Sequence, residues 1–294
     1  MDYFSISDIE HLSGIKAHTL RIWEHRYRIL KPKRKESKHR FYDNEDLKRI
    51  LIIAHLNRNG HKISKIARMS DAQIRSFTLE EELTESVYEN FIHQFAEACR
   101  NLDEERFNKI FHTVVLHLGL EKTVLHIFYP LLERIGRNWM VNEILPVQEH
   151  FASSMISRKI VMAIEHLERA TKGELTILFN PENEHHAIPL LFINYLLKRR
   201  GKRVINFGTD VSLEKLEAFM QRNKTDRLHF HLITNLNHHS PAELVNVLLQ
   251  RFPQQQIILS GPFAGTIRLT HKRLRLLSGP GALLHYCDEP VTEN

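Results

Sequence analysis

Apolar side chains near the start of the chain recur at helical spacing in two short stretches. Ile6, Ile9 and Leu12 share one face of a first helix, and Gly14 permits the positive φ that a tight turn requires. The spacing predicts a second helix from about Ala17 to Tyr27. The residues expected to form a small core with the first helix are Ile15, Leu20 and Trp23. The chain therefore opens with a helix, a turn and a second helix.

The next stretch, residues 31–42, is KPKRKESKHRFY, which is rich in cations and too polar to bury. At its end Arg40 and Tyr42 alternate with Phe41, as in a strand with one packed face. These elements outline a winged helix-turn-helix, whose second helix enters the major groove of DNA. Residues 1–75 hold 17 Lys and Arg against 9 Asp and Glu, or +8, whereas the rest of the chain brings the net charge to +6. The positive charge thus lies where phosphate binding would use it.

Three segments of this module resemble the MerR family of transcription regulators. They are residues 19–27 (TLRIWEHRY) in the second helix, Arg40-Phe41-Tyr42 in the wing and Glu45-Asp46-Leu47 in a following helix. The resemblance covers about residues 2–70 and implies that the second helix and the wing contact DNA. The residues expected to do so are Lys16, His18, Thr19, Arg21, Lys38, Arg40 and Tyr42. The alternative is that Thr19 and Arg21 only cap and solvate an ordinary helix.

Helical patterning continues beyond the wing. Residues 43–59 and 63–69 predict two more helices of the first domain, which spans 1–75, and the acidic stretch Ser70–Glu85 marks a boundary. Residues 86–170 then predict four helices, with breaks at Asn101–Asp103, at Gly119 and at Asn142–Leu145. Because the connections are short, we expect an antiparallel four-helix bundle.

From residue 173 onward, short apolar runs alternate with amphipathic stretches. Strands are expected at 174–180, 203–208, 228–236, 256–261 and 282–286, and helices at 187–200, 212–222 and 241–252. This alternation predicts that residues 173–294 form a flavodoxin-like (Rossmann-like) parallel sheet with helices on both faces. The whole chain would then be a multidomain protein of α and α/β parts. Ligands of such sheets bind at the carboxyl ends of the strands, here the loops at 180–186, 208–211, 234–240 and 260–265.

Two groups of residues have the spacing of a binding site. Trp139 stands ten residues before Glu149-His150, and Glu184–His186 follows the first strand of the α/β domain. A helical bundle with this W-x9-EH spacing before a flavodoxin-like domain resembles the cobalamin-binding module of methionine synthase and of light-sensing, cobalamin-dependent MerR-type repressors of carotenoid synthesis. The resemblance implies that His186 coordinates cobalt from below and that Glu184 orients its ring. It places Trp139, Glu149 and His150 over the upper face of the corrin.

Several positions depart from the cobalamin-binding pattern. The expected glycine after the histidine is Pro189, which has a fixed φ and no amide donor. The usual S-x-L is Thr234-Asn235-Leu236, and the usual glycine pair is Ser260-Gly261. The resemblance makes Thr234, Leu236, Ser260 and Gly261 the lining of the pocket for the benzimidazole tail, which the larger side chains would narrow. Met140 stands where the light-sensing repressors carry another histidine, which argues against the same photochemistry.

Simpler interpretations remain open for the same residues. His185-His186 would also suit a solvated pair at a helix N-terminus, since histidine is frequent in this chain. Trp139 would equally suit the bundle core, and Glu149-His150 would suit an internal hydrogen-bonded pair. A zinc site joining His185 to His238-His239 lacks the Cys or carboxylate spacing of known zinc sites.

Other features of the composition narrow the class of protein. Cys99 and Cys287 form neither a metal-binding spacing nor a disulfide framework, and no apolar stretch is long enough to span a bilayer. We therefore expect a cytoplasmic protein without a membrane partner. The sequence has no Gly-rich phosphate loop, nucleophile elbow or pair of catalytic carboxylates, which argues against an enzyme.

Together these patterns predict a sequence-specific, DNA-binding transcription regulator of MerR type. Its cobalamin-binding-like region would sense a ligand, with cobalamin as the candidate, and would control oligomerisation and operator binding. The expected partners are a double-stranded DNA operator and further copies of the chain, in a homo-oligomer that is a dimer or tetramer. One alternative is a fold that no longer binds cobalamin and acts through protein partners or another small ligand. Another is a corrinoid-carrying subunit of an enzyme.

Overall fold

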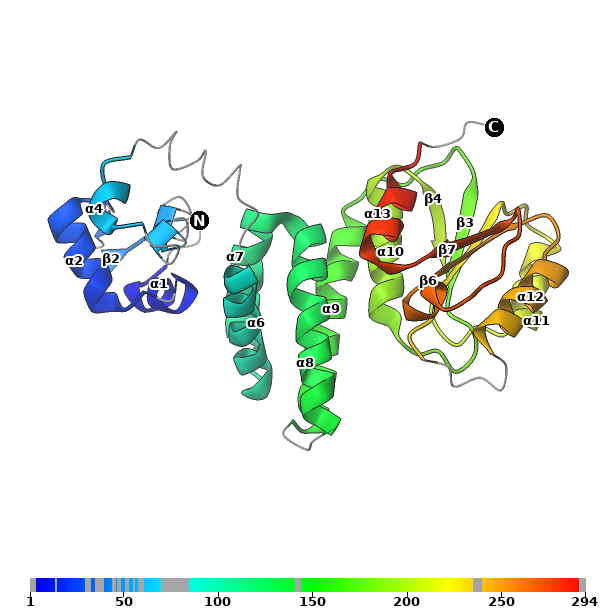
Figure 1. The fold of residues 1–294 in the computed structure, drawn as a ribbon, viewed down its shortest axis with the longest axis horizontal. Coiled ribbons are helices and arrows are strands. Elements are labelled where there is room, and N and C mark those ends of the chain that lie inside the picture. Colours follow the sequence, from blue (N-terminus) through cyan, green and yellow to red (C-terminus); the bar gives the residue numbers. More distant parts are fainter. Residues whose placement is uncertain are drawn as a thin grey trace. The chain divides into compact units, whose positions relative to one another are not determined.

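The computed structural model describes residues 4–290 apart from 14, 30–32, 35–39, 44–45, 47–48, 51–52, 55, 58–60, 70–84, 141–143 and 235–239 (Figure 1). The chain divides into two compact units, Met1–Glu149 and His150–Asn294. Within the described residues, no helix has both the length and the apolar character needed to cross a lipid bilayer.

The first unit opens with the expected helix-turn-helix. α1 spans Ile6–Ser13 and α2 spans Ala17–Tyr27, as predicted. The short strands β1 (Lys33–Arg34) and β2 (Arg40–Phe41) pair antiparallel and form the wing. In the two following predicted helices, the described residues between 46 and 57 are helical, and α4 spans Ile63–Ile66. Gly14 and most of the expected boundary at Ser70–Glu85 lie outside the described residues.

Four helical segments follow in the described part of the chain, and aromatic side chains pack between the first three of them. These helices are α6 (Glu85–Arg100), α7 (Glu104–Thr123), the π-helical segment η1 (Val124–Phe128) and α8 (Tyr129–Met140). Phe95, Phe107 and Phe128 are fully buried, with ring centroids 4.7, 5.4 and 6.1 Å apart. The predicted break at Gly119 is present, because its φ of 73° and ψ of 163° interrupt the helical backbone. The fourth predicted helix, α9 (Pro146–Glu165), begins in the first unit and continues into the second.

A five-stranded parallel sheet forms the centre of the second unit. Its strands are β3 (Leu175–Phe179), β4 (Arg203–Asn206), β5 (Arg227–His231), β6 (Gln256–Ser260) and β7 (Leu274–Leu277). The order β4-β3-β5-β6-β7 is that of flavodoxin-like sheets. In such sheets the ligand-binding crevice lies where the strand order reverses. Here that switch point falls between β3 and β5.

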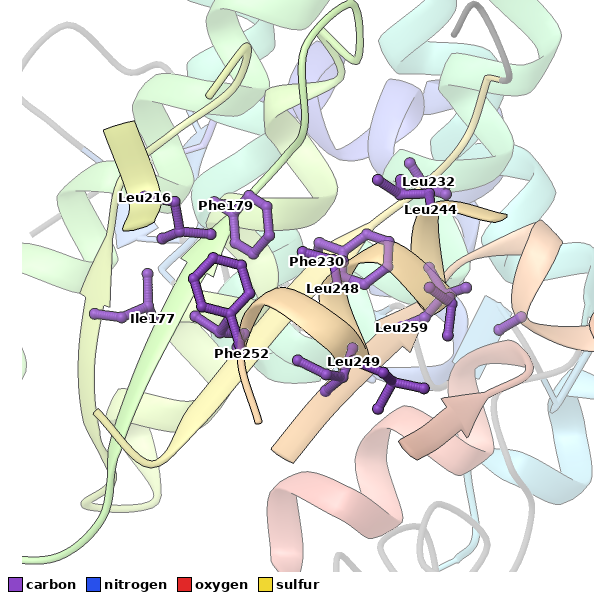
Figure 2. Packing of buried hydrophobic residues seen from close by; sticks show 14 of the residues in the cluster. Ile177, Phe179, Leu216, Phe230, Leu232, Leu244, Leu248, Leu249, Phe252 and Leu259 are labelled. Atoms are coloured by element: carbon purple, nitrogen blue, oxygen red, sulfur yellow. The ribbon is translucent and has the colours of Figure 1, made fainter. Parts of the chain in front are cut away.

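Helices cover the sheet on both faces (Figure 1). α11 (Leu213–Met220) and α12 (Pro241–Arg251) enclose an apolar core that includes Leu216, Phe230 and Leu248 (Figure 2). α10 (Ala187–Arg199) and α13 (Gly279–Asp288) cover the opposite face. The strands carry buried polar side chains on that face, among them His229 and Ser260. The two faces of the sheet therefore differ in chemistry.

The predicted strand at 282–286 is wrong. These residues lie in α13, and the fifth strand is β7, which the prediction missed. A short apolar run fits a strand or a buried helix equally well. Here Gly279, with a φ of 82°, and Pro280 in the first turn begin a helix.

Candidate functional site

Helix α2 has one buried and one exposed face. Leu20 and Trp23 are buried against α1, and Arg28 ends the helix in the left-handed conformation with a φ of 51°. The residues predicted to contact DNA from α2 all reach the surface: Lys16, His18 and Arg21 are exposed, and Thr19 is half-buried. Lys16 Nζ lies 3.2 Å from the Glu10 carboxylate. A ring nitrogen of His18 lies 3.3 Å from the Thr19 hydroxyl.

Tyr42, which was predicted to contact DNA from the wing, is fully buried. Its hydroxyl donates a hydrogen bond to the Glu24 carboxylate on α2, and its backbone pairs with Phe4. We therefore revise the role of Tyr42 from DNA contact to support of α2, because a buried ring cannot meet a phosphate. Lys38 and the side chain of Arg40 lie outside the described residues, so their DNA contacts stay predictions.

Removing the Tyr42 hydroxyl tests this support role. Tyr42→Phe should lower the free energy of unfolding of the first module by about 2 kcal/mol, because a hydrogen bond to a carboxylate is lost. The chain has two tryptophans, so Trp fluorescence in a Trp139→Phe background reports Trp23 during urea denaturation. Tyr27→Phe is the matched control and should change little. Equal stability of the two variants would contradict the support role.

Glu184 is the centre of the site in the second unit. It lies between β3 and α10, is 1% exposed, and accepts hydrogen bonds at both carboxylate oxygens. Oε1 accepts from the backbone N–H of His186 at 3.0 Å and from its Nδ1 at 2.6 Å. Oε2 accepts from the backbone N–H groups of Ile233 and Thr234, each at 2.9 Å, and from the Thr234 hydroxyl at 3.2 Å. One carboxylate therefore joins the loops after β3 and β5 at the switch point.

The same contacts explain why β5 ends earlier than predicted. The expected strand ran from 228 to 236, but β5 ends at His231. The N–H groups of Ile233 and Thr234 donate to the Glu184 side chain and so are not available to a neighbouring strand.

Electrostatics fixes the orientation of the His186 ring. Burial alone would raise the pKa of Glu184, but hydrogen bonds from His186, Thr234 and Ile233 outweigh it and lower the pKa to about 2. The carboxylate is therefore ionised at neutral pH and can only accept. In the neutral imidazole the proton then lies on Nδ1 and the lone pair on Nε2. The His186 side chain is 47% exposed, at the N-cap position of α10.

A polar cluster beside this loop joins Ser260, a predicted cofactor contact, to two histidines that the sequence prediction missed. Ser260 Oγ lies 2.9 Å from His229 Nε2 and 2.9 Å from His231 Nδ1. Burial lowers the pKa of His229 to about 3 and that of His231 to about 4, so both rings are neutral at pH 7. Asn180 donates to the carbonyl of His186 at 3.0 Å and accepts from the N–H of His231 at 3.2 Å. The period-two spacing of the two histidines in β5 could have indicated the cluster.

Two positions have structural reasons for their residue type. Gly261 has a φ of 101°, and a Cβ there would lie 2.3 Å from the backbone oxygen of Leu232, so only glycine fits. Pro189 lies in the first turn of α10, where its missing N–H removes no helical hydrogen bond.

The remaining predicted cofactor contacts are not tested. Leu236 and the side chain of Trp139 lie outside the described residues. Glu149 and His150 are neighbours on α9, half-buried and exposed respectively, at the division between the units. Their contacts to a corrin stay predictions.

Known proteins resemble both parts of the chain. The family described as MerR HTH family regulatory protein matches residues 4–73, and the B12 binding domain family matches residues 91–163. The chain is 26% identical over 246 residues to the HTH-type transcriptional repressor CarA of Myxococcus xanthus, which covers 83% of this chain and 80% of that protein. It is 25% identical over 221 residues to the HTH-type transcriptional repressor CarH of the same organism, covering 72% and 73%.

A solved structure has a similar fold over about two thirds of the chain. The monomethylamine corrinoid protein of Methanosarcina barkeri is 14% identical, with a TM-score of 0.52 over 68% of this chain and 98% of that one. The helix-turn-helix and wing fall within the MerR match, and α6 to α9 span the B12 binding match. The chain is therefore a MerR-type helix-turn-helix transcription regulator with a domain of the B12 binding family, homologous to the CarA and CarH repressors.

Proposed function

We propose that two or more copies of this regulator bind a DNA operator through α2 and the wing, and that a corrinoid held at His186 changes this assembly. The observation that carries the corrinoid part is the hydrogen-bonded series Thr234, Glu184 and His186 at the switch point of the sheet. The exposed cationic face of α2 supports the DNA part. One winged module makes few base contacts, so copies on a two-fold symmetric operator would supply the affinity.

His186 offers a single ring nitrogen, Nε2, as a metal ligand. One such ligand suits a metal whose other ligands come from a macrocycle. Among the residues that the structure describes, no group of three or more His, Cys, Asp or Glu could hold a bare metal ion. A single imidazole with Nδ1 held by a carboxylate would instead supply one nitrogen ligand to a metal that a macrocycle holds. When bound, a corrinoid would supply a cobalt centre that can exchange ligands. His186 would hold it, Glu184 would keep the proton on Nδ1, and Thr234 would anchor Glu184.

We also propose that Trp139, Glu149 and His150 would contact the corrinoid. Met140, next to that tryptophan, has no nitrogen with which to bind cobalt. The proposed response is therefore to the corrinoid itself rather than to light. A ligand shifts assembly only as far as it binds one assembly state better than the other.

Replacing His186 tests the corrinoid part. The full chain, incubated with adenosylcobalamin in the dark and desalted, should retain a red chromophore. His186→Ala should alter its absorption spectrum and weaken its retention by about tenfold or more, because the axial nitrogen is lost. His185→Ala removes the exposed neighbouring imidazole and should change neither property. Colourless wild-type protein, or an unaltered spectrum in His186→Ala, would contradict the proposal.

Selection from random duplexes by the 294-residue chain tests the DNA part, and a near-palindromic sequence should be enriched. The affinity of the protein for that duplex is then measured with and without adenosylcobalamin. The two values should differ by about 5- to 150-fold, which is the range that ordinary coupling energies produce. Sedimentation under both conditions should show the matching change in assembly. Equal affinity and equal assembly in both conditions would contradict coupling.

A second candidate is a regulator whose α/β domain takes another small ligand or a protein partner. Ser260 favours it, because its side chain replaces a glycine and binds His229 and His231 in the region predicted to take the cofactor tail. Operator binding would then be indifferent to corrinoids. An enzyme subunit has only the fold in its favour, since the CarA and CarH relatives are repressors.

A further inference from the structure

The DNA-facing side of α2 carries one side chain that is neither polar nor packed. Ile22 is 53% exposed, and it is the only large apolar residue with this exposure in the described part of residues 4–69. The resemblance to known regulators leaves this position unspecified. A single exposed isoleucine is ordinary on a protein surface, so its surroundings decide whether it has a role.

Those surroundings form a cationic rim around an apolar side chain. A surface hollow of about 530 Å³ is lined by Arg21, Ile22, His25 and Arg26. Helical spacing puts His18 and His25 one turn away from Ile22 on either side along the same face. The hollow is therefore part of the surface that this helix would present to DNA.

The chemistry of this surface selects its partner. A protein helix docking on Ile22 would have to bury the charges of Arg21 and Arg26, whereas a DNA groove supplies phosphates for them at its edges. Within the major groove, the apolar group that a side chain can contact is the C5-methyl group of thymine. Arginine, in turn, contacts the O6 and N7 atoms of guanine.

We infer that Ile22 determines part of the operator sequence by packing on a thymine methyl group, beside a base pair contacted by Arg21. This inference rests on the proposed DNA-binding function. It adds a residue and a base identity that the resemblance does not supply. It predicts that the selected half-site contains a thymine whose methyl group contributes to binding.

Replacing thymine by uracil removes only that methyl group. With the duplex selected by the wild-type full chain, one uracil substitution in a single half-site should weaken binding about fourfold, because a buried methyl contributes about 0.8 kcal/mol. Ile22→Ala should bind the thymine duplex more weakly and should not distinguish uracil from thymine at that position. Ile22→Val, which keeps a branched apolar side chain, should retain most of the discrimination.

Two controls separate packing from charge and from general effects. Leu116→Ala changes a 63% exposed leucine of α7 and should keep the wild-type response to uracil. Ile22→Ala should leave the salt dependence of binding unchanged. Replacing a phosphate-binding cation would instead reduce the slope of log affinity against log salt concentration by about one.

The outcomes distinguish this inference from the function on which it rests. If the wild-type chain enriches no sequence, the DNA-binding proposal fails. If it enriches a sequence in which no uracil substitution weakens binding, or if Ile22→Ala keeps the wild-type discrimination, the inference about Ile22 is overturned and DNA binding stands.

Discussion

Glu184→Gln is expected to destabilise the α/β domain by about 3 kcal/mol at pH 7, which is the difference that its lowered pKa represents. Glutamine keeps the size of the side chain but replaces one acceptor oxygen with an NH2 donor. In one orientation this NH2 would face the N–H groups of His186, and in the other it would face those of Ile233 and Thr234. Either orientation leaves buried donors without acceptors, at a cost of about 1–3 kcal/mol each.

Hydrogen exchange measures this loss where it occurs. The backbone amides of Ile233 and Thr234 should exchange faster in Glu184→Gln, and amides of β3 and β5 should report the lower free energy of opening. Glu182→Gln, in the same loop but exposed, is the matched control and should exchange like wild type. If both variants kept wild-type protection at Ile233 and Thr234, Glu184 would not be the link between these loops.

The stability difference between wild type and Glu184→Gln should depend on pH. The pKa of Glu184 is lowered from 4.5 to about 2 in the folded state, so the unfolded chain takes up the proton first as pH falls. Its stabilisation is therefore complete above about pH 4.5 and is lost as pH falls toward 2. Wild type and Glu184→Gln should converge in stability over that window. Burial lowers the pKa of His231 and the charge of Glu184 opposes this, so the titration of that ring near pH 4 also contributes to the difference between the two proteins.

Local patterns were sufficient to predict much of the fold. The bounds of α2 and the break at Gly119 follow from apolar spacing and from glycine, both of which act over a few residues. The prediction of a strand at 282–286 was wrong because it too relied on a short local pattern. A run such as Ala282–Tyr286 is apolar in either structure, and only Gly279 and Pro280 before it indicate a helix.

The candidate site could be predicted only in part. Glu184 and His186 lie two residues apart, so a motif can contain both. The Thr234 hydroxyl reaches Glu184 from fifty residues away, and Ser260 reaches His231 from twenty-nine. Such contacts depend on the order of strands in the sheet. Tyr42 shows the converse, since a wing position typical of DNA contact holds a buried side chain bound to Glu24.

The double substitution Arg21→Ala/Arg40→Ala is expected to weaken operator binding by about 100-fold or more. Each lost base or phosphate contact costs about 1–3 kcal/mol, and two contacts disappear from every half-site. Arg21 is exposed on the face of α2 that carries Ile22, and Arg40 lies in β2 of the wing. Gel retardation of the selected duplex at several salt concentrations measures the loss, and the salt slope should fall by about one for each phosphate contact removed.

A charge-matched control decides whether position or net charge is responsible. Arg100→Ala/Arg222→Ala removes two exposed arginines outside the winged module and lowers the net charge by the same amount. If long-range attraction alone held the DNA, both double variants would bind alike, because the charge of the whole chain would set the affinity. If α2 and the wing contact the operator, only the first should lose binding. If Arg21→Ala/Arg40→Ala retarded the duplex as wild type does, these arginines would not lie in the interface. The proposed docking of α2 would then be wrong.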